Sequence, residues 1–319
     1  MPRLRSFPLL FAALLVALAL TPERAAAQVD EDLAETYVEM ARLDQQISQM
    51  AGQFQQQLQG QVYQLPEPAR EPFIAIFADV LSEASLQERL VEYTEAEADA
   101  DRLQAAIAWM GDEAVQAMWD AELAVADDPN AQVALQMYAM TGQFGDTEVA
   151  PERQALIDRY MEATGTEAKA VDLYLDVIVA ASQSMSGMIS GDEAPPADSI
   201  RAQMRPQLEG MVGNMARGSL LYAYRDLPDE QVAAYVEKAG GPEAQYALGL
   251  GMDAMGAAMA GAMREAGRRM AETLQELDAA GEIDLDALRA EAQAEAAERE
   301  AAQGEAAGGN ARETPEDDG

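Results

Sequence analysis

The sequence predicts an all-α protein, with antiparallel helices in one or two related bundles followed by an acidic tail. Ala, Glu, Gln, Leu, Met and Arg dominate the chain, and all are good helix formers. No stretch alternates apolar and polar side chains with the β-branched residues that are typical of strands. Gly, Pro and Asp residues divide the chain into segments of helical length. We therefore expect helices throughout and no sheet.

The N-terminus has the pattern of a secretory signal peptide over residues 1–27. A basic region precedes an apolar run from Phe7 to Leu20, and a triplet of alanines ends at Ala27. The apolar run is short for a membrane span, and no cysteine follows it for lipid attachment. We expect cleavage before Gln28 and a periplasmic or secreted product without stable membrane insertion.

Residues 28–148 are expected to form an N-terminal helical half. Apolar residues at three- and four-residue spacing predict an amphipathic helix from Asp30 to about Gly60. Two prolines then interrupt the chain, and Gly111 ends a later helix. Asp128-Pro129 marks a further helix start. The remaining helices of this half are expected over 71–81, 94–110 and 112–126.

Residues 149–280 are expected to form a C-terminal helical half. Pro151 opens a helix that Gly165 ends, and Pro228 opens another whose first acids suit the helix dipole. Gly240-Gly241 separates that helix from a last long one beginning at Pro242. The other helices are expected over 168–189, 201–216 and 220–225, with a linker at 190–199.

Residues 281–319 are an acidic tail with few large apolar side chains. A helix is expected over about 286–303. From residue 304 onward we expect disorder, because too little apolar surface is available to offset the entropy of ordering.

Two parts of the chain resemble each other. Leu90–Met118 aligns with Leu220–Leu248, since each has an aromatic residue, an acidic turn, an apolar helix, a glycine and a following helix. Upstream, YVEMARLDQQISQM (residues 37–50) resembles RYMEATGTEAKAVDLYLDVI (residues 159–178) in pattern only. We expect two related halves from a duplication. The alternative is chance similarity between amphipathic segments that are rich in Ala and Glu.

The second half also resembles a known family. YRDLPDEQVAAYVEKAGGPEAQYA (Tyr224–Ala247) is similar to the core motif of the domain-of-unknown-function family 2059, although Ala244 stands where that motif has glycine. LIDRYMEATGTEAKAVDLY (Leu156–Tyr174) is similar to the family's leading helices. The resemblance covers about 151–270, with a divergent second copy at 30–127. It implies an exported, all-helical bacterial protein and assigns no catalytic residues.

Composition restricts the chemistry. The chain contains no cysteine and no histidine, so thiol nucleophiles, imidazole bases and the usual zinc sites are absent. The formal net charge of −36 disfavours nucleic acid and anionic lipid as partners. We expect no cofactor and a non-catalytic, chaperone-like module that binds a protein or peptide in the cell envelope.

One methionine stripe stands out in the last long helix. Met252, Met255, Met259 and Met263 recur at helical spacing, with small residues between them. Flexible methionine fills irregular core gaps, and this is the interpretation we favour. The stripe is also our candidate interaction face, and soft thioethers make a Cu(I)-handling protein the alternative. Small residues in this helix predict a close helix–helix contact, at Gly249, Gly251, Gly256, Ala260 and Gly267. We expect the contact to lie within the chain, and the alternative is a subunit interface.

Paired carboxylates offer a third function, a hydrolase that uses acids alone. The pairs available are Asp99/Asp101, Glu95/Glu97 and Asp229/Glu230. With 57 acidic residues in the chain, such pairs arise by chance. We therefore expect no enzyme and no metal site.

Overall fold

The computed structural model describes residues 29–63, 65–144, 149–189, 195–290 and 294. Over these residues the protein is an all-α bundle without a β-strand, which confirms the predicted fold class, and twelve helices precede a last helical segment at 285–290. The first seven helices are α2 (Glu31–Met40), α3 (Leu43–Val62), α4 (Glu67–Val80), α5 (Glu83–Glu97), α6 (Ala100–Met110), α7 (Glu113–Asp127) and α8 (Ala131–Thr141). The last five are α9 (Pro151–Thr164), α10 (Thr166–Ile189), α11 (Ala197–Ala223), α12 (Asp229–Ala239) and α13 (Pro242–Ala279).

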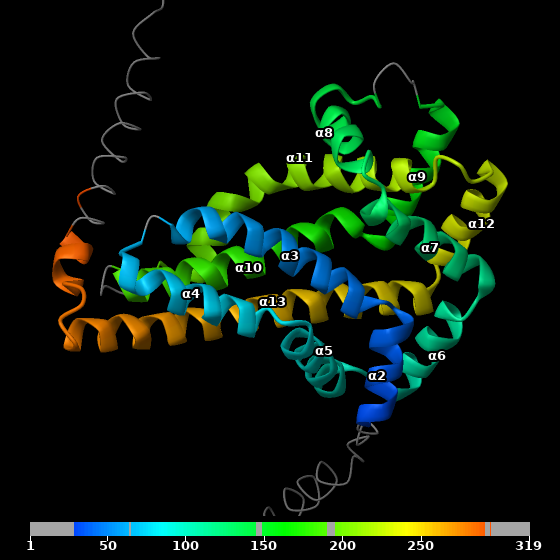
Figure 1. Ribbon diagram of the computed structural model, residues 1–319. Coiled ribbons are helices and arrows are strands. Elements are labelled where there is room, and N and C mark those ends of the chain that lie inside the picture. The colour runs from blue at the N-terminus through cyan, green and yellow to red at the C-terminus, as the bar shows by residue number, and fades with distance from the viewer. Residues whose placement is uncertain (1–28, 64, 145–148, 190–194, 291–293, 295–319) are drawn as a thin grey trace, which may run out of the picture.

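The 38-residue helix α13 is the axis of the bundle. It packs most extensively on α10 and also contacts α3, α4, α5 and α6, while shorter helices gather around one end (Figure 1). One hydrophobic core draws on both halves, from Val29 to Leu285. A smaller cluster joins α10 to α11. The two halves therefore share a core and do not form separate bundles.

The two halves repeat one order of helices. In each half a residue of positive φ follows the first helix (α2 or α9) within two residues, Arg42 at 54° or Gly165 at 65°, and a long helix comes next. Farther on, an 11-residue helix (α6 or α12) ends at a glycine, Gly111 or Gly240, which leads directly into the next helix. The order matches the alignment of the two halves in sequence.

The helix that follows this glycine in each half, α7 or α13, packs against the opposite half. Helix α7 contacts α11 and α12, and α13 contacts α5 and α6 in return. Several positions that the sequence alignment pairs are buried alike, as in Val91 and Leu221 or Ala106 and Val236. This reciprocal packing is why the core cannot be divided between the halves.

Several helix boundaries in the first half differ from prediction, and contacts in the structure explain two of them. The helix expected from Asp30 to Gly60 breaks at Arg42, whose guanidinium forms an ion pair with Asp120 at 2.6 Å. The helix expected over 94–110 is two helices, because the side chain of Asp99 accepts a hydrogen bond from the Arg102 amide and starts α6. Both breaks depend on contacts that local helix propensity does not reveal.

Helix α11 is longer than predicted. It runs unbroken from Ala197 to Ala223, across the expected interruption at 217–219. Its Gly213 and Gly218 serve as contact points, since an added Cβ would meet the Glu167 carboxyl group or the Tyr138 ring. The packing of α11 against α8 and α10 thus stabilises the helical turns of α11 that contain these glycines.

Other predictions concern the chain ends. Gly281 has a φ of 72° and follows α13, and residues 285–290 are helical. The predicted signal peptide, its cleavage site at Ala27 and Gln28, and the disorder predicted from residue 304 lie outside the described residues. Among the helices in the described ranges, none has an apolar stretch long enough to cross a bilayer.

Candidate functional site

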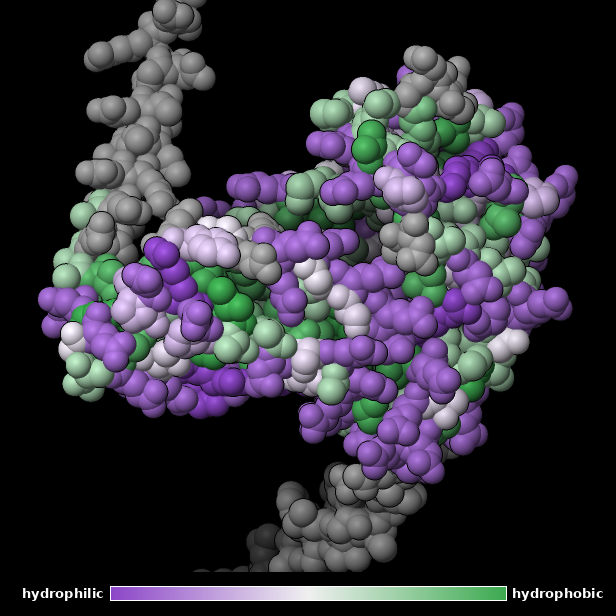
Figure 2. All heavy atoms as spheres, viewed as in Figure 1, coloured by the Kyte–Doolittle hydropathy of each residue, from purple (hydrophilic) through white to green (hydrophobic). Residues whose placement is uncertain are grey.

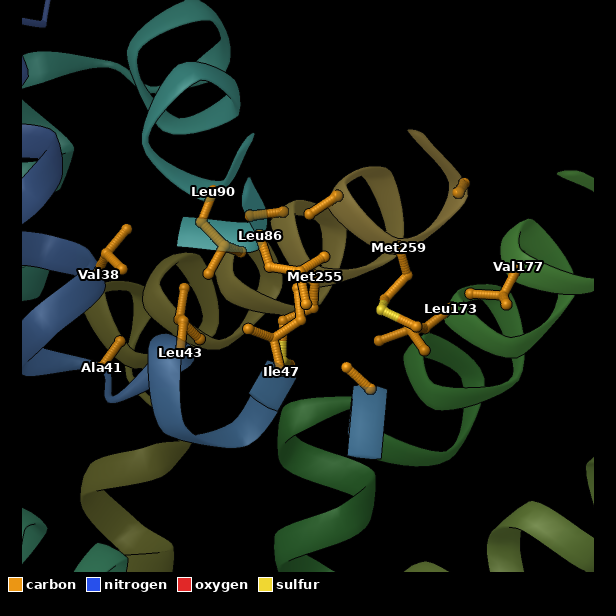
Figure 3. Close-up of a cluster of buried hydrophobic side chains, with 14 of the residues drawn as sticks. Val38, Ala41, Leu43, Ile47, Leu86, Leu90, Leu173, Val177, Met255 and Met259 are labelled. Atoms are coloured by element: carbon orange, nitrogen blue, oxygen red, sulfur yellow. The ribbon is translucent and has the colours of Figure 1, made fainter. Parts of the chain in front are cut away.

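The methionine stripe of α13 lies in the core. Met255, Met259 and Met263 are buried, and Met252 is partly buried against the same cluster. Met255 lies among side chains of α3 and α5, and Met259 points toward α10 (Figure 3). Their surroundings are those of core side chains. The stripe therefore leaves no open interaction face at its three buried positions, which corrects that prediction.

Glycines set the spacing around this stripe, and the predicted close approach within the chain is confirmed. A Cβ added at Gly256 would lie 3.7 Å from the Leu173 Cα, and one at Gly267 would lie 2.2 Å from the Ser184 Cβ. Both neighbours belong to α10. Small residues on α13 thus let two backbones come close enough for α10 to cover the methionines.

Two acids of the predicted carboxylate pairs have structural roles. Asp99 caps α6, and Asp229 accepts a hydrogen bond from Arg153 at 2.6 Å. Arg153 also donates to the carbonyl of Leu227 and so fastens α9 to the start of α12. Within the described ranges, no group of three or more acids is placed to hold a metal ion.

Two hollows open on the surface. The hollow between α3 and α4 has a volume of about 80 Å³ and an apolar lining that includes Leu58 and Phe77. The hollow between α9 and α12 has a volume of about 360 Å³ and is lined in part by Arg159, Asp229 and Glu230. The second hollow contains one predicted acid pair, but Asp229 is already bonded to an arginine.

Sequence reasoning missed a cluster of polar groups on α7, α9, α11 and α12. The Tyr224 hydroxyl donates a hydrogen bond to the Glu122 carboxyl group. Trp119 Nε1 donates to the Tyr235 hydroxyl at 3.1 Å, and that oxygen lies 3.4 Å from the Tyr160 hydroxyl. The rings of Tyr160 and Tyr235 stack with centroids 5.4 Å apart. We call these five residues the Glu122 cluster.

Burial controls the electrostatics of this cluster. It raises the pKa of Glu122 to about 7, an effect that the hydrogen bond from Tyr224 only partly opposes. Burial also raises the pKa values of Tyr160, Tyr224 and Tyr235. The carboxyl group therefore titrates near neutrality while the three phenols keep their protons.

A sequence signal for Glu122 exists. Val115, Met118, Trp119 and Glu122 follow i, i+3, i+4, i+7 spacing, so the acid continues an apolar helical stripe. An acid on the buried face of a helix needs a hydrogen-bonding partner. The sequence does not show which residue provides it, because Tyr224 is 102 positions away.

The surface exposes a second set of methionines. Helix α8 contains no charged residue, and its outer face exposes Val133 (63%), Met137 (37%) and Met140 (74%). Neighbouring α11 exposes Met211 (54%) and Met215 (47%). Apolar side chains are visible at the surface over α8 (Figure 2). We call these five residues the α8–α11 face.

Aromatic packing attaches α8 to α11. The Tyr138 ring covers Gly218 and stacks on Phe144 with centroids 4.7 Å apart. Phe144 in turn packs against Tyr222, whose hydroxyl donates to Asp128 at 2.7 Å. The apolar face is therefore carried by a helix that is fixed at both ends.

Comparison with protein-family models, with curated proteins and with solved structures gives no match for this chain. The resemblance of 151–270 to the domain-of-unknown-function family 2059 thus stays a prediction, and the function has to be argued from the geometry.

Proposed function

We propose that the protein is an exported, non-catalytic binding protein whose α8–α11 face binds a cationic amphipathic segment of another protein. The observation that carries the proposal is the exposure of five large apolar side chains on two neighbouring helices. Contiguous exposed apolar surface on a protein marks interaction sites.

The composition of the face suits an apolar helix as occupant. Unbranched methionine adapts to differently shaped partners. On α11 the exposed positions beside Met211 and Met215 include uncharged Gln207, Gly210 and Asn214. A partner helix can therefore bury apolar residues there without leaving a charge of this protein unpaired.

Net charge selects the kind of partner. With a formal charge of −36, the chain repels a second copy of itself and attracts lysine- and arginine-bearing segments. We therefore assign the face to a segment with one apolar side and one basic side. The cell envelope as the place of binding follows from the signal-peptide pattern of residues 1–27.

Fluorescence anisotropy tests the proposal with residues 28–319 and a labelled helical peptide that has a leucine face and a lysine face. We expect binding that weakens with added salt. A peptide with glutamate in place of lysine should not bind. The triple variant Val133→Ser, Met140→Ser, Met211→Ser should weaken binding about tenfold or more.

Matched exposed apolar residues elsewhere provide the control. Tyr63, which is 64% exposed, directly follows α3, and Ile74, which is 39% exposed, lies within α4. Both residues are away from the α8–α11 face. The double variant Tyr63→Ser, Ile74→Ser should bind as the unchanged protein does. Equal losses in both variants, or no loss in the first, would reject the assignment.

A further inference from the structure

Helices α7 and α8 form one arm, residues 113–141, that is fastened to the second half. Near the middle of α7, Glu122 meets Tyr224 at the end of α11. Just beyond α7, Asp128 accepts hydrogen bonds from Tyr222 and Arg225. The arm is thus held at Glu122 and at Asp128, by two carboxyl groups in different surroundings.

The groups that face Glu122 are uncharged. The cluster presents Tyr224 from α11, Tyr235 from α12 and Tyr160 from α9, and α6 contributes the Trp109 ring against Trp119. Three cations on the neighbouring elements pair with other acids, Lys238 with Asp112, Arg225 with Asp128 and Arg153 with Asp229, and Arg159 of α9 lines the surface hollow between α9 and α12. Among the described residues, none forms an ion pair with Glu122.

We propose that Glu122 is a pH-sensitive latch, which holds helix α7 of the arm against α11 and α12 while its carboxyl group is protonated and loosens α7 when the group ionises. The hydrogen bond from the Tyr224 hydroxyl favours the ionised form but offsets only part of the desolvation cost of its charge. A neutral carboxyl group is satisfied by hydrogen bonds to phenols. An ionised one in the same place is a partly buried charge without a cation, and exposing it fully to water relieves the desolvation cost.

The two attachment points respond differently to pH. The pKa of Glu122 is raised to about 7, so this contact changes near neutrality. At Asp128, hydrogen bonds from the Asn130 amide and Tyr222 lower the pKa, so that contact stays ionised and intact over the same range. The arm therefore loosens along α7 while Asp128 acts as the pivot.

The chain contains its own reporters for this event. Its only two tryptophans are Trp109 and Trp119, which pack edge to face with centroids 5.8 Å apart, and Trp119 bonds within the cluster. Loosening of the arm changes the surroundings of both rings. The two indole ¹⁵N–¹H signals and the tryptophan emission maximum therefore report on the latch alone, whatever molecule the protein binds.

The experiment follows these signals from pH 5.5 to 8.5 in residues 28–319. We expect one transition with a midpoint near 7 in the unchanged protein and in Glu113→Gln, which removes an exposed carboxyl group from the same helix. The transition should be absent in Glu122→Gln. In Tyr224→Phe the midpoint should rise, because the hydrogen bond that stabilises the ionised form is lost.

Two results would overturn the latch. One is an unchanged transition in Glu122→Gln, and the other is a flat profile in the unchanged protein. If Glu122→Gln fails to fold, as judged by circular dichroism, Tyr224→Phe decides: a midpoint equal to that of the unchanged protein counts against the proposal.

Discussion

The hydroxyl of Tyr37 donates a hydrogen bond to the backbone carbonyl of Ala247 at 2.6 Å, although the two residues are 210 positions apart. The Tyr37 side chain is fully buried. One turn farther along α13, Gly251 leaves room for this hydroxyl, because an added Cβ would lie 3.1 Å from it. The first helix of the N-terminal half is thereby fixed to the first turns of the axis of the bundle.

Removing this hydroxyl should weaken the whole fold. Tyr37→Phe leaves the ring in place and deletes one buried hydrogen bond, so we expect the free energy of unfolding to fall by about 1 kcal/mol in urea titrations. Tyr63→Phe is the control, since Tyr63 is 64% exposed. A loss of the same size in the control would show that burial of the phenol is not the cause.

Replacing a glycine by alanine should lower the stability of the protein at one position and raise it at another. Gly267→Ala places a Cβ 2.2 Å from the Ser184 Cβ and 3.1 Å from its Cα, so α10 and α13 must separate and thermal stability should fall. Gly52→Ala in α3 meets no atom within 4 Å and should add about 0.5–1 kcal/mol. Stabilisation by both variants would contradict the close packing of α10 on α13.

Protonation of Glu122 should make stability depend on pH. Its pKa rises from an ordinary 4.5 to about 7 on folding. Between these values the folded carboxyl group keeps a proton that the unfolded one loses, so the free energy of unfolding falls as pH rises. The protonated Glu122 carboxyl group contributes at most about 3 kcal/mol to the free energy of unfolding. This contribution is complete below pH 4.5 and is lost as pH rises through 7.

Comparing the unchanged protein with Glu122→Gln at each pH separates the effect of Glu122 from that of the other carboxyl groups. The difference in unfolding free energy between the unchanged protein and Glu122→Gln should shrink by about 3 kcal/mol between pH 4.5 and 8. The corresponding difference for exposed Glu113→Gln should vary much less over that range. Parallel pH curves for the unchanged protein and Glu122→Gln would disprove the shift.

The buried methionines should behave as core side chains. Met259→Leu keeps the volume and should cost less than about 1.5 kcal/mol, whereas Met259→Ala leaves a cavity and should cost about 2–5 kcal/mol. Cu(I) added under reducing conditions should leave the melting temperature unchanged. A rise in melting temperature with Cu(I) that Met259→Leu abolishes would instead support the Cu(I)-handling alternative.

Local signals in the sequence predicted much of the helical order. Pro151 and Gly165 delimit α9 as expected, because proline suits a first turn and glycine accepts the φ of 65° at its end. The glycine spacing of α13 likewise predicted a close internal contact, which Gly256 and Gly267 make with α10. Such features depend on backbone sterics and are readable from one segment at a time.

Features that depend on distant partners were not predictable. The break at Arg42 shows no glycine or proline and is supported by an ion pair to Asp120, 78 positions later. The methionine stripe of α13 gave no indication of which helix would cover it, and the sequence did not show that Met140 and Met211 are exposed. Periodicity identifies an apolar face, but only the tertiary packing decides whether that face is covered.

Hydrogen–deuterium exchange of residues 28–319 with and without the lysine-faced helical peptide tests the central claim most directly. Saturating peptide should slow exchange in α8, residues 131–141, and along the exposed stripe of α11, residues 203–215, because the α8–α11 face becomes covered. Exchange in the α3–α4 region, residues 55–78, should not change. Protection confined to α3 and α4, or no protection anywhere, would contradict the assignment of binding to the α8–α11 face.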